Sequence, residues 1–185
     1  MYQTSKLIAA CLRGEETAQK QLYDTYAKQM LGVCYRYTKS MEDAEDVLQE
    51  GFIRVFKNLD QFKGEGELGA WVRKIMVNAA LNFLKKHQAY RDELIMKEEF
   101  LHPISDDNPE ILLNAKELIQ LVRQLPAGYQ TIFNLYAVEG YSHVEIGKML
   151  GINESTSRSQ YMRARNLLVT WMEKFSGENK KVNYV

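Results

Sequence analysis

The sequence is poor in the residues that cross-link or interrupt a chain. Its 185 residues include two cysteines and three prolines. Two cysteines are too few for a disulfide framework or a zinc site, and so little proline is atypical of disordered or fibrous chains. Cys11 and Cys34 lie within apolar helical patterns and are predicted to be buried thiols.

Segments that would direct the chain to a membrane are also lacking. The longest unbroken apolar run, Leu7 to Leu12, is far shorter than a bilayer span. The N-terminus has no basic segment leading into an apolar stretch and a small-residue cleavage site, so we expect a cytoplasmic protein. With 45% hydrophobic and 26% charged residues, the composition is that of a folded chain with room for one medium domain or two small ones.

Motifs for catalysis or cofactor binding are missing as well. The three histidines form no His-Glu-x-x-His pattern, and the glycine-containing loop at 62–67 lacks the Lys-Ser/Thr ending and the preceding strand of a phosphate-binding loop. There is no nucleophile elbow or paired-cysteine motif. We therefore expect no cofactor, no metal ion and no catalytic residue.

The net charge is zero, but the charges are arranged in blocks. The chain has 24 basic and 24 acidic residues. Residues 41–50 carry five acids and no base, residues 68–91 carry five bases and no acid, and residues 92–110 carry seven acids and one lysine. Because salt screens exposed charges beyond roughly 8–10 Å, each block acts locally. Different parts of the chain are thus expected to meet different partners.

Apolar residues recur at intervals of three and four, and alternating β-branched patterns are absent. The sequence predicts an all-α fold of two small helical domains joined by an acidic linker at 92–110. Expected helices in the first domain span 3–13, 16–38, 41–58 and 68–88. In the second, Pro126 separates a helix ending at Leu125 from one at 127–138. The tail from Gly177 to Val185 is expected to be loose.

The C-terminal unit contains a helix-turn-helix pattern. Ser142 and Glu145 form a capping box that opens a short helix, and this helix ends before Gly151. A longer helix begins near Ser155, where its N-terminal residues can lie in a DNA major groove. We expect groove-facing side chains at Thr156, Ser157, Arg158 and Gln160, with Arg163 and Arg165 nearer the phosphates. The alternative is an ordinary helical hairpin with a solvated basic face, which is disfavoured by the small residues Gly147 and Gly151, since these allow close helix crossing.

The segment 41–58 is strongly amphipathic. Ser40 followed by Asp43 resembles a capping box at its start, and one face of the wheel is apolar: Ala44, Val47, Leu48, Gly51, Phe52, Val55 and Leu59. The opposite stripe holds Glu42, Asp46, Gln49, Ile53 and Lys57. Ile53 within this stripe is typical of an interface anchor rimmed by charge. A solvated face with one isolated isoleucine is the alternative.

The segment 68–88 has an apolar face and a second stripe without carboxylates. The apolar face comprises Val72, Met76, Val77, Ala80, Phe83 and Leu84, and the stripe comprises Trp71, Lys74, Asn78, Asn82 and Lys85. Aromatic, amide and lysine side chains in such a row can stack on bases and follow a phosphate backbone. Packing between helices is the alternative, above all for Trp71. The glycines of the preceding loop allow its backbone to approach a ligand closely.

Four stretches of the chain resemble bacterial RNA polymerase sigma factors of the extracytoplasmic-function (ECF) group, within the sigma-70 family. They are the acidic stretch Asp43 to Glu50, the segment Phe62 to Ile75, the pair Leu125-Pro126, and the segment from Glu139 through Glu145-Ile146 to Arg165. The resemblance implies a sigma region 2 domain at 1–91, the linker at 92–110, a sigma region 4 domain at 111–178 and a tail at 179–185.

The resemblance also implies roles for individual residues. The first domain would bind the clamp helices of core polymerase through Asp43, Asp46, Gln49, Glu50 and Ile53. It would open the minus-ten promoter element through Phe62, Lys63, Gly64, Trp71, Lys74, Asn78, Asn82 and Lys85, with the loop at 62–68 capturing a flipped base. The second would bind the minus-thirty-five element through Ser155, Thr156, Ser157, Arg158, Gln160, Arg163 and Arg165. The acidic linker would pass near the RNA path.

The implied partners are core RNA polymerase, promoter DNA and an anti-sigma factor, with the chain monomeric within the holoenzyme. Leu68, Gly147, Ser155 and Ser157 depart from the residues usual in the family, which affects promoter sequence and loop geometry. Two other hypotheses remain. One is a stand-alone helix-turn-helix regulator that dimerises on a palindromic site. The other is a helical hydrolase using His87, His102 or His143, for which no motif is present.

Overall fold

The computed structural model describes residues 2–86 and 115–182, with side chains described for 4–86 and 117–173. All regular elements in these two ranges are helical, which confirms the predicted all-α fold. The chain divides into two units, residues 1–87 and 88–185. The predicted linker at 92–110, together with His87 and His102, lies outside the described residues.

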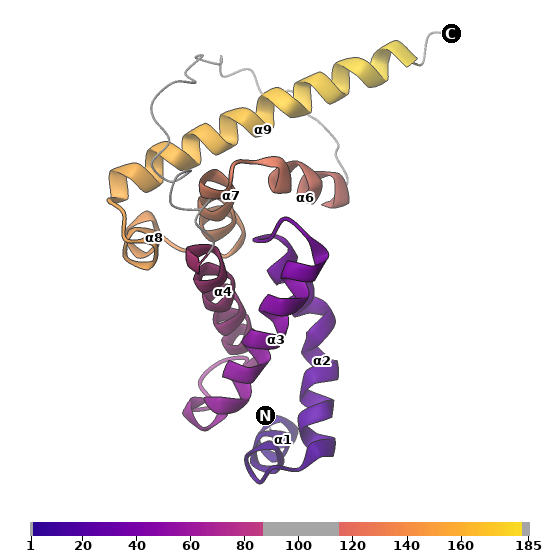
Figure 1. The fold of residues 1–185 in the computed structure, drawn as a ribbon, viewed down its shortest axis with the longest axis vertical. Helices are drawn as coiled ribbons and strands as arrows, with labels where there is room; N and C mark the ends of the chain where they lie inside the picture. The colour runs from indigo at the N-terminus through magenta and orange to yellow at the C-terminus, as the bar shows by residue number, and fades with distance from the viewer. Residues whose placement is uncertain (1, 87–114, 183–185) are drawn as a thin grey trace. The chain divides into compact units, whose positions relative to one another are not determined.

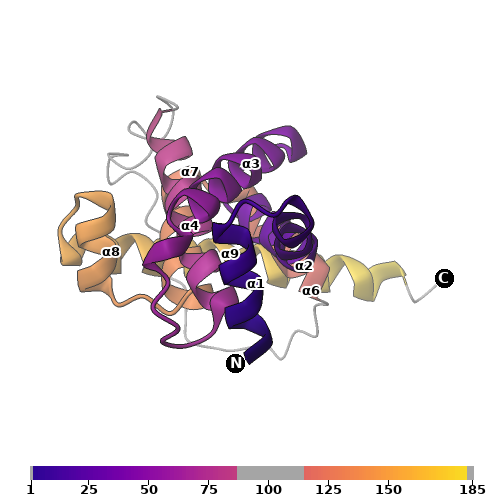
Figure 2. The ribbon, with the colours of Figure 1, turned by 90° about the horizontal axis from the view of Figure 1, so that it is seen from below.

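The first unit is built from four helices and a short 3-10 turn (Figure 1). They are α1 (Tyr2–Leu12), α2 (Glu16–Tyr35), α3 (Met41–Lys57), η1 (Leu59–Gln61) and α4 (Leu68–Lys86). Helices α2, α3 and α4 pack against one another, and α1 packs against α2 (Figure 2). Helix α2 ends three residues before the predicted boundary at 38, and both Tyr37 and Thr38 are buried beyond its end.

The core of the first unit is the apolar side of these helices. All seven residues assigned to the apolar face of α3 are buried, as predicted. On α4 the predicted face is buried except for Phe83, which is half-buried. Gly51 lies where α3 packs on α4, and a Cβ at this position would displace the Met76 side chain.

Both cysteines are buried, as the sequence predicted. Burial raises the pKa of the Cys34 thiol to about 12, and it also raises the pKa of Cys11. Thiols with raised pKa values form little of the reactive thiolate at neutral pH. The cysteines therefore contribute packing rather than chemistry.

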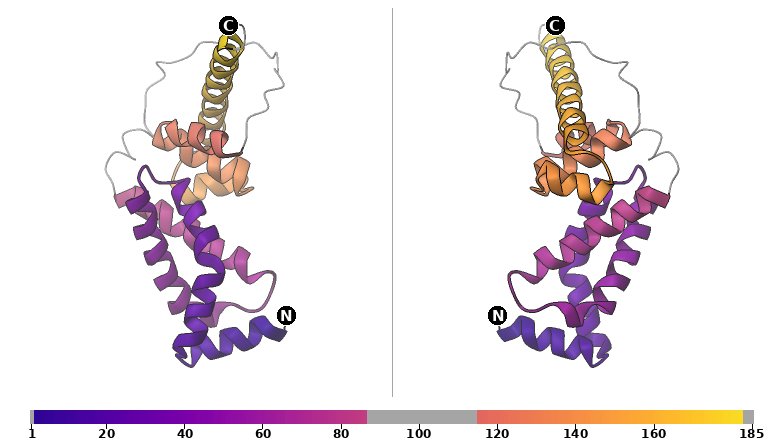
Figure 3. Two further views of the ribbon diagram at one scale, coloured as in Figure 1. Left: turned by 90° about the vertical axis from the view of Figure 1, so that its right-hand side faces the viewer. Right: turned by 90° about the vertical axis from the view of Figure 1, so that its left-hand side faces the viewer.

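The second unit contains α6 (Ala115–Gln124), α7 (Ala127–Phe133), the π-helical turn η2 (Asn134–Val138), α8 (His143–Leu150) and α9 (Glu154–Val182). Its apolar core joins α6 to α9 through Leu121, Val122, Leu125, Ala164 and Leu168. Helix α9 projects beyond the other helices of this unit (Figure 3). It runs to Val182, so the prediction of a loose tail from Gly177 was wrong over the described part.

None of the helices in the described ranges is both long enough and apolar enough to cross a membrane.

Candidate nucleic-acid interface

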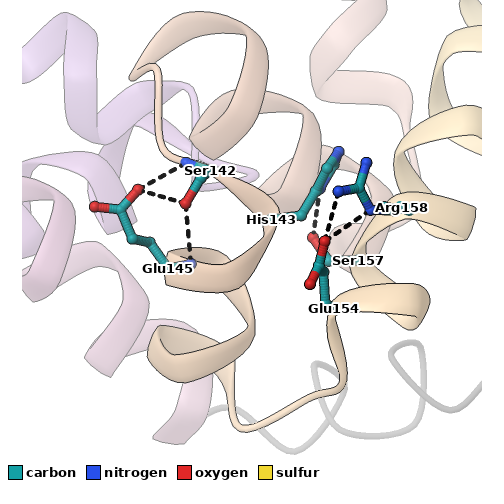
Figure 4. A network of polar contacts seen from close by, with 6 residues as sticks. All are labelled: Ser142, His143, Glu145, Glu154, Ser157 and Arg158. Carbon is teal, nitrogen blue, oxygen red and sulfur yellow. Dashed lines mark hydrogen bonds and ion pairs between the residues drawn. The ribbon is translucent and has the colours of Figure 1, made fainter.

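A capped helix, a tight turn and a second helix form the helix-turn-helix predicted from the sequence. Ser142 Oγ accepts from the backbone N–H of Glu145 at 3.3 Å, and Glu145 Oε2 accepts from the backbone N–H of Ser142 at 2.8 Å (Figure 4). Helix α8 then ends at Leu150 and is capped by Gly151, whose φ of 71° is the left-handed conformation that glycine adopts most easily. A Cβ on Gly147 would lie 2.8 Å from the Ile152 carbonyl oxygen, so glycine permits the close approach of the turn to α8.

Two residues predicted to face the groove are instead buried. Ser157 has no exposed surface and Gln160 is 5% exposed. They lie on the same face of α9 as Ala164 and Leu168, at the helical spacing of a buried stripe. Packing of this stripe against the rest of the unit sets the rotation of α9 and turns Ser157 and Gln160 inward. The groove-facing assignment was wrong for these two residues.

The outward face of α9 carries a partly different set of side chains. Ser155, Arg158 and Arg165 are exposed, as predicted, and Thr156 and Arg163 are half-buried. Ser159 and Met162 are exposed on the same side as Arg158, and sequence reasoning missed them both. Helical periodicity could have identified Met162. Once Ala164 and Leu168 are assigned to the core, Met162, four residues after Arg158, lies on the same outward side as Arg158.

Arg158 is held by an acidic side chain at the start of the same helix. Its Nε and Nη2 atoms both donate to Glu154 Oε1, at 2.9 and 2.5 Å (Figure 4). The two side chains are 64% and 43% exposed, so the pair lies at the surface. Glu154 was not among the predicted site residues.

His143 joins α8 to α9 from beneath this surface. Its Nδ1 atom lies 2.9 Å from Ser157 Oγ in a buried hydrogen bond, and its ring stacks on Tyr136, with centroids 4.2 Å apart. Burial lowers the pKa of His143, the positive charge of Arg158 lowers it further, and Glu154 acts in the opposite direction. The lowered pKa favours the neutral imidazole, which serves as a structural hydrogen-bonding group.

Helix α3 of the first unit presents the predicted acidic stripe. Asp46, Gln49 and Glu50 are exposed, Asp43 is half-buried, and Ile53 is 50% exposed. Ser40 Oγ accepts from the backbone N–H of Asp43 at 3.0 Å, which is one half of the capping box expected there. Arg54 Nε donates to Glu50 Oε1 at 2.9 Å, and this hydrogen bond, with the charge of Arg54, lowers the pKa of Glu50. The face is thus a carboxylate surface with one apolar side chain.

The third candidate surface comprises α4 and the loop before it. Lys63, Lys74, Asn78 and Lys85 are exposed, whereas Phe62, Trp71 and Asn82 are half-buried. The rings of Phe62 and Trp71 lie 5.6 Å apart, so Trp71 packs on the loop while retaining some exposure.

The loop itself depends on two glycines in the left-handed region. Gly64 and Gly66 have φ values of 76° and 83°. The loop borders a cavity of about 400 Å³ whose other walls include Ile8 and Tyr26. Burial raises the pKa of the Tyr26 hydroxyl, and the nearby charge of Glu67 adds to this effect.

Comparison with known proteins identifies both units. Residues 22–90 match the family model for sigma-70 region 2, and residues 115–168 match that for sigma-70 region 4. The chain is 29% identical to the ECF RNA polymerase sigma factor SigW of Bacillus subtilis, over 88% of this chain and 93% of the relative. It is 30% identical to the ECF RNA polymerase sigma-E factor of Haemophilus influenzae, over 88% of this chain and 91% of the relative.

A longer relative is also similar. The chain is 30% identical to the ECF RNA polymerase sigma factor SigE of Mycolicibacterium smegmatis, over 85% of this chain but only 63% of that protein's length. Among solved structures, the sigma factor RpoE of Bartonella quintana, in complex with the anti-sigma factor NepR, has a TM-score of 0.51 at 20% identity. That match covers 84% of this chain and 96% of the matched chain, and it shows a shared fold. The two family models and the Haemophilus relative together establish that this chain belongs to the ECF group of sigma-70 RNA polymerase sigma factors.

Proposed function

We propose that this sigma factor binds core RNA polymerase through its first unit and directs promoter recognition, DNA melting and transcription initiation. The observation that carries the proposal is the pairing, in one chain, of an exposed carboxylate face around Ile53 with a capped helix-turn-helix. A domain division at 1–91, 92–110 and 111–178 fits this assignment, with the second domain extended along α9. The protein would act in the cytoplasm and perform no bond chemistry itself.

The polymerase-binding surface is assigned to α3. Asp43, Asp46, Gln49 and Glu50 precede Ile53 along α3 and supply negative charge and hydrogen-bonding groups, and Ile53 supplies the apolar anchor. Such an arrangement of an apolar centre within a polar rim is typical of binding hot spots. The exposure of Ile53 on an otherwise well-packed helix supports this role.

The minus-ten surface is assigned to the loop before α4 and to the outward stripe of α4. Its members are Phe62, Lys63, Gly64, Trp71, Lys74, Asn78, Asn82 and Lys85. Rings, amides and cations in a row can stack on unpaired bases and follow their phosphates. Capture of an unstacked base recovers part of the few kcal/mol lost when it leaves the duplex.

The minus-thirty-five surface is assigned to the start of α9. The side chains available there are Ser155, Thr156, Arg158, Ser159, Met162, Arg163 and Arg165, because Ser157 and Gln160 are buried. Arginine can donate two hydrogen bonds to the O6 and N7 atoms of a guanine, and an apolar side chain can contact a thymine methyl group.

The two DNA-binding surfaces are expected to work only together. A single small DNA-binding module buries about 600–1,000 Å² and binds weakly alone. When both modules are attached to one polymerase, binding of the first raises the effective concentration of the second. Promoter specificity would therefore belong to the holoenzyme.

An anti-sigma factor is proposed as the regulatory partner. The structurally similar RpoE of Bartonella quintana was solved with such a partner. Isolation of the chain from its own cells under mild conditions, followed by identification of co-purifying proteins, would detect one.

The proposed function is tested by size-exclusion chromatography of the purified chain with core RNA polymerase, followed by run-off transcription. We expect co-elution and promoter-dependent transcripts. A folded chain that fails to co-elute, yet binds a palindromic duplex as a dimer, would support the stand-alone regulator instead.

A further inference from the structure

We propose that Glu154 is a positioning residue for Arg158 and increases the ability of the recognition helix to discriminate between base pairs. This inference rests on the proposed binding of α9 to the minus-thirty-five element. It concerns a residue that neither the sequence motifs nor the role assignments include. The inference is based on the two hydrogen bonds that Arg158 donates to Glu154 on the exposed first turns of α9.

The geometry leaves Arg158 able to read a base while it is held. A guanidinium has five N–H donors: one on Nε and two on each terminal nitrogen. Glu154 Oε1 accepts from Nε and Nη2, so one donor on Nη2 and both donors on Nη1 remain for DNA. Two parallel N–H groups at the tip match the O6 and N7 acceptors of guanine. Glu154 therefore occupies one edge of the guanidinium and leaves the guanine-reading edge available.

Fixing the side chain favours the base contact for an entropic reason. A free arginine loses several rotatable bonds when it binds, and this loss opposes binding. Arg158 is 64% exposed, and Glu154 accepts hydrogen bonds from two of its nitrogens. Because the contact restricts the side chain before DNA arrives, less freedom is lost on forming the bidentate contact. The benefit applies only where the base offers matching acceptors.

The charge of Glu154 acts on the competing, sequence-independent mode of binding. A lone arginine can form an ion pair with any phosphate, and each such contact contributes to salt-dependent, non-specific affinity. With Glu154 beside it, the pair has no net charge, and the carboxylate repels phosphate oxygens. Both effects act in the same direction: they favour Arg158 contacts to a base edge over contacts to the backbone.

The test is a double-mutant cycle in the reconstituted holoenzyme. The probe is a linear duplex library randomised across both promoter elements, from which the wild-type holoenzyme selects a preferred sequence; single-base variants of that sequence are then compared. Glu154→Gln, Arg158→Ala and the double variant are measured for affinity, base discrimination and salt dependence. Glu173→Gln is the matched control, because this exposed glutamate lies on the same helix away from its first turns.

We expect Glu154→Gln to lower discrimination at one base pair by about 3- to 10-fold, which is part of the discrimination that a full bidentate contact provides. Binding to non-preferred DNA should strengthen, and the slope of log K against log salt should steepen by about 0.9, corresponding to one added phosphate contact. Glu173→Gln should change neither quantity. In the Arg158→Ala background, Glu154→Gln should have no effect on discrimination.

Two results would overturn the proposal. Unchanged discrimination in Glu154→Gln would show that the contact is only a surface ion pair. Loss of discrimination in the Arg158→Ala background would show that Glu154 contacts a base directly, for example as an acceptor for cytosine N4. If the wild-type chain selects no sequence, or fails to bind polymerase, the proposed function fails and the inference fails with it. Equal melting temperatures of the variants would exclude an effect through folding.

Discussion

Replacement of Ser157 by alanine tests whether the buried contact to His143 holds the recognition helix in place. Ser157 has no exposed surface, and its Oγ lies 2.9 Å from His143 Nδ1. Removal of the hydroxyl leaves a buried ring nitrogen without this partner. A buried polar group that loses its partner destabilises a fold by about 1–3 kcal/mol. The second unit is small, so a urea m-value of about 1–1.5 kcal/mol/M gives a fall in its unfolding midpoint of about 0.7–3 M.

The assay can report on the second unit alone. The chain has two tryptophans, Trp71 in the first unit and Trp171, which packs on the apolar core of the second. In a Trp71→Phe background, tryptophan fluorescence during urea unfolding comes from Trp171 only. Ser159→Ala is the matched control, because Ser159 is exposed and its hydroxyl donates to a backbone carbonyl at 3.1 Å on the same helix.

The control should move the midpoint by only a few tenths of a molar, since exposed substitutions change stability by about 0.5 kcal/mol or less. Equal shifts for Ser157→Ala and Ser159→Ala would refute the argument, because they would show that the buried contact contributes no more than a solvated hydroxyl.

Three further predictions concern the binding surfaces and the buried histidine. Ile53→Asp should abolish co-elution with core polymerase without altering the circular dichroism spectrum. Met41→Asp, at another exposed apolar position on α3, should leave polymerase binding intact. Loss of polymerase binding in both variants would indicate a general effect of charge. Arg158→Ala should lower promoter discrimination by about 1–3 kcal/mol in a competition assay, whereas Arg165→Ala should weaken binding to all sequences and reduce the salt slope by about 1. An equal loss of affinity for all sequences in Arg158→Ala would instead show that Arg158 contacts phosphate. The folded-state pKa of His143 is lowered, so the unfolded chain gains a proton first as the pH falls below 6.5, the ordinary histidine pKa. The contribution of the neutral imidazole to stability is therefore present above pH 6.5 and is lost as the pH falls below that value. His143→Gln should remove this part of the pH dependence of the unfolding free energy measured in urea, and an unchanged pH profile would contradict the prediction.

Much of the fold could be predicted because local signals agreed with the packing. Ser142, Glu145 and Gly151 set the ends of α8 where the sequence placed them. The apolar stripe of α3 is buried throughout, and Ile53 points outward as the wheel predicted. In these segments one helix presents a broad apolar face, so periodicity alone fixes which side is buried.

The recognition helix was harder to predict because its buried side is partly polar. Ser157 and Gln160 resemble DNA-reading residues by chemical type, yet they occupy the same face as Ala164. Periodicity arguments assign polar residues to the outside, and that assumption fails when a polar side chain has a buried partner such as His143. The contact between Glu154 and Arg158 was missed for a different reason: sequence reasoning treated arginine as a free cation.

The buried contact and the exposed face of α9 are connected through the rotation of the helix. Packing of Ala164 and Leu168 against the core sets which side of α9 faces inward. The hydrogen bond between Ser157 and His143 narrows this angle further, since a hydrogen bond weakens steeply with misalignment. A helical residue next to Ser157 changes direction by about 100° around the axis, so the angle that seats Ser157 also determines where Arg158 points. The proposed promoter reading by Arg158 would thus depend on the buried polar contact of the neighbouring Ser157.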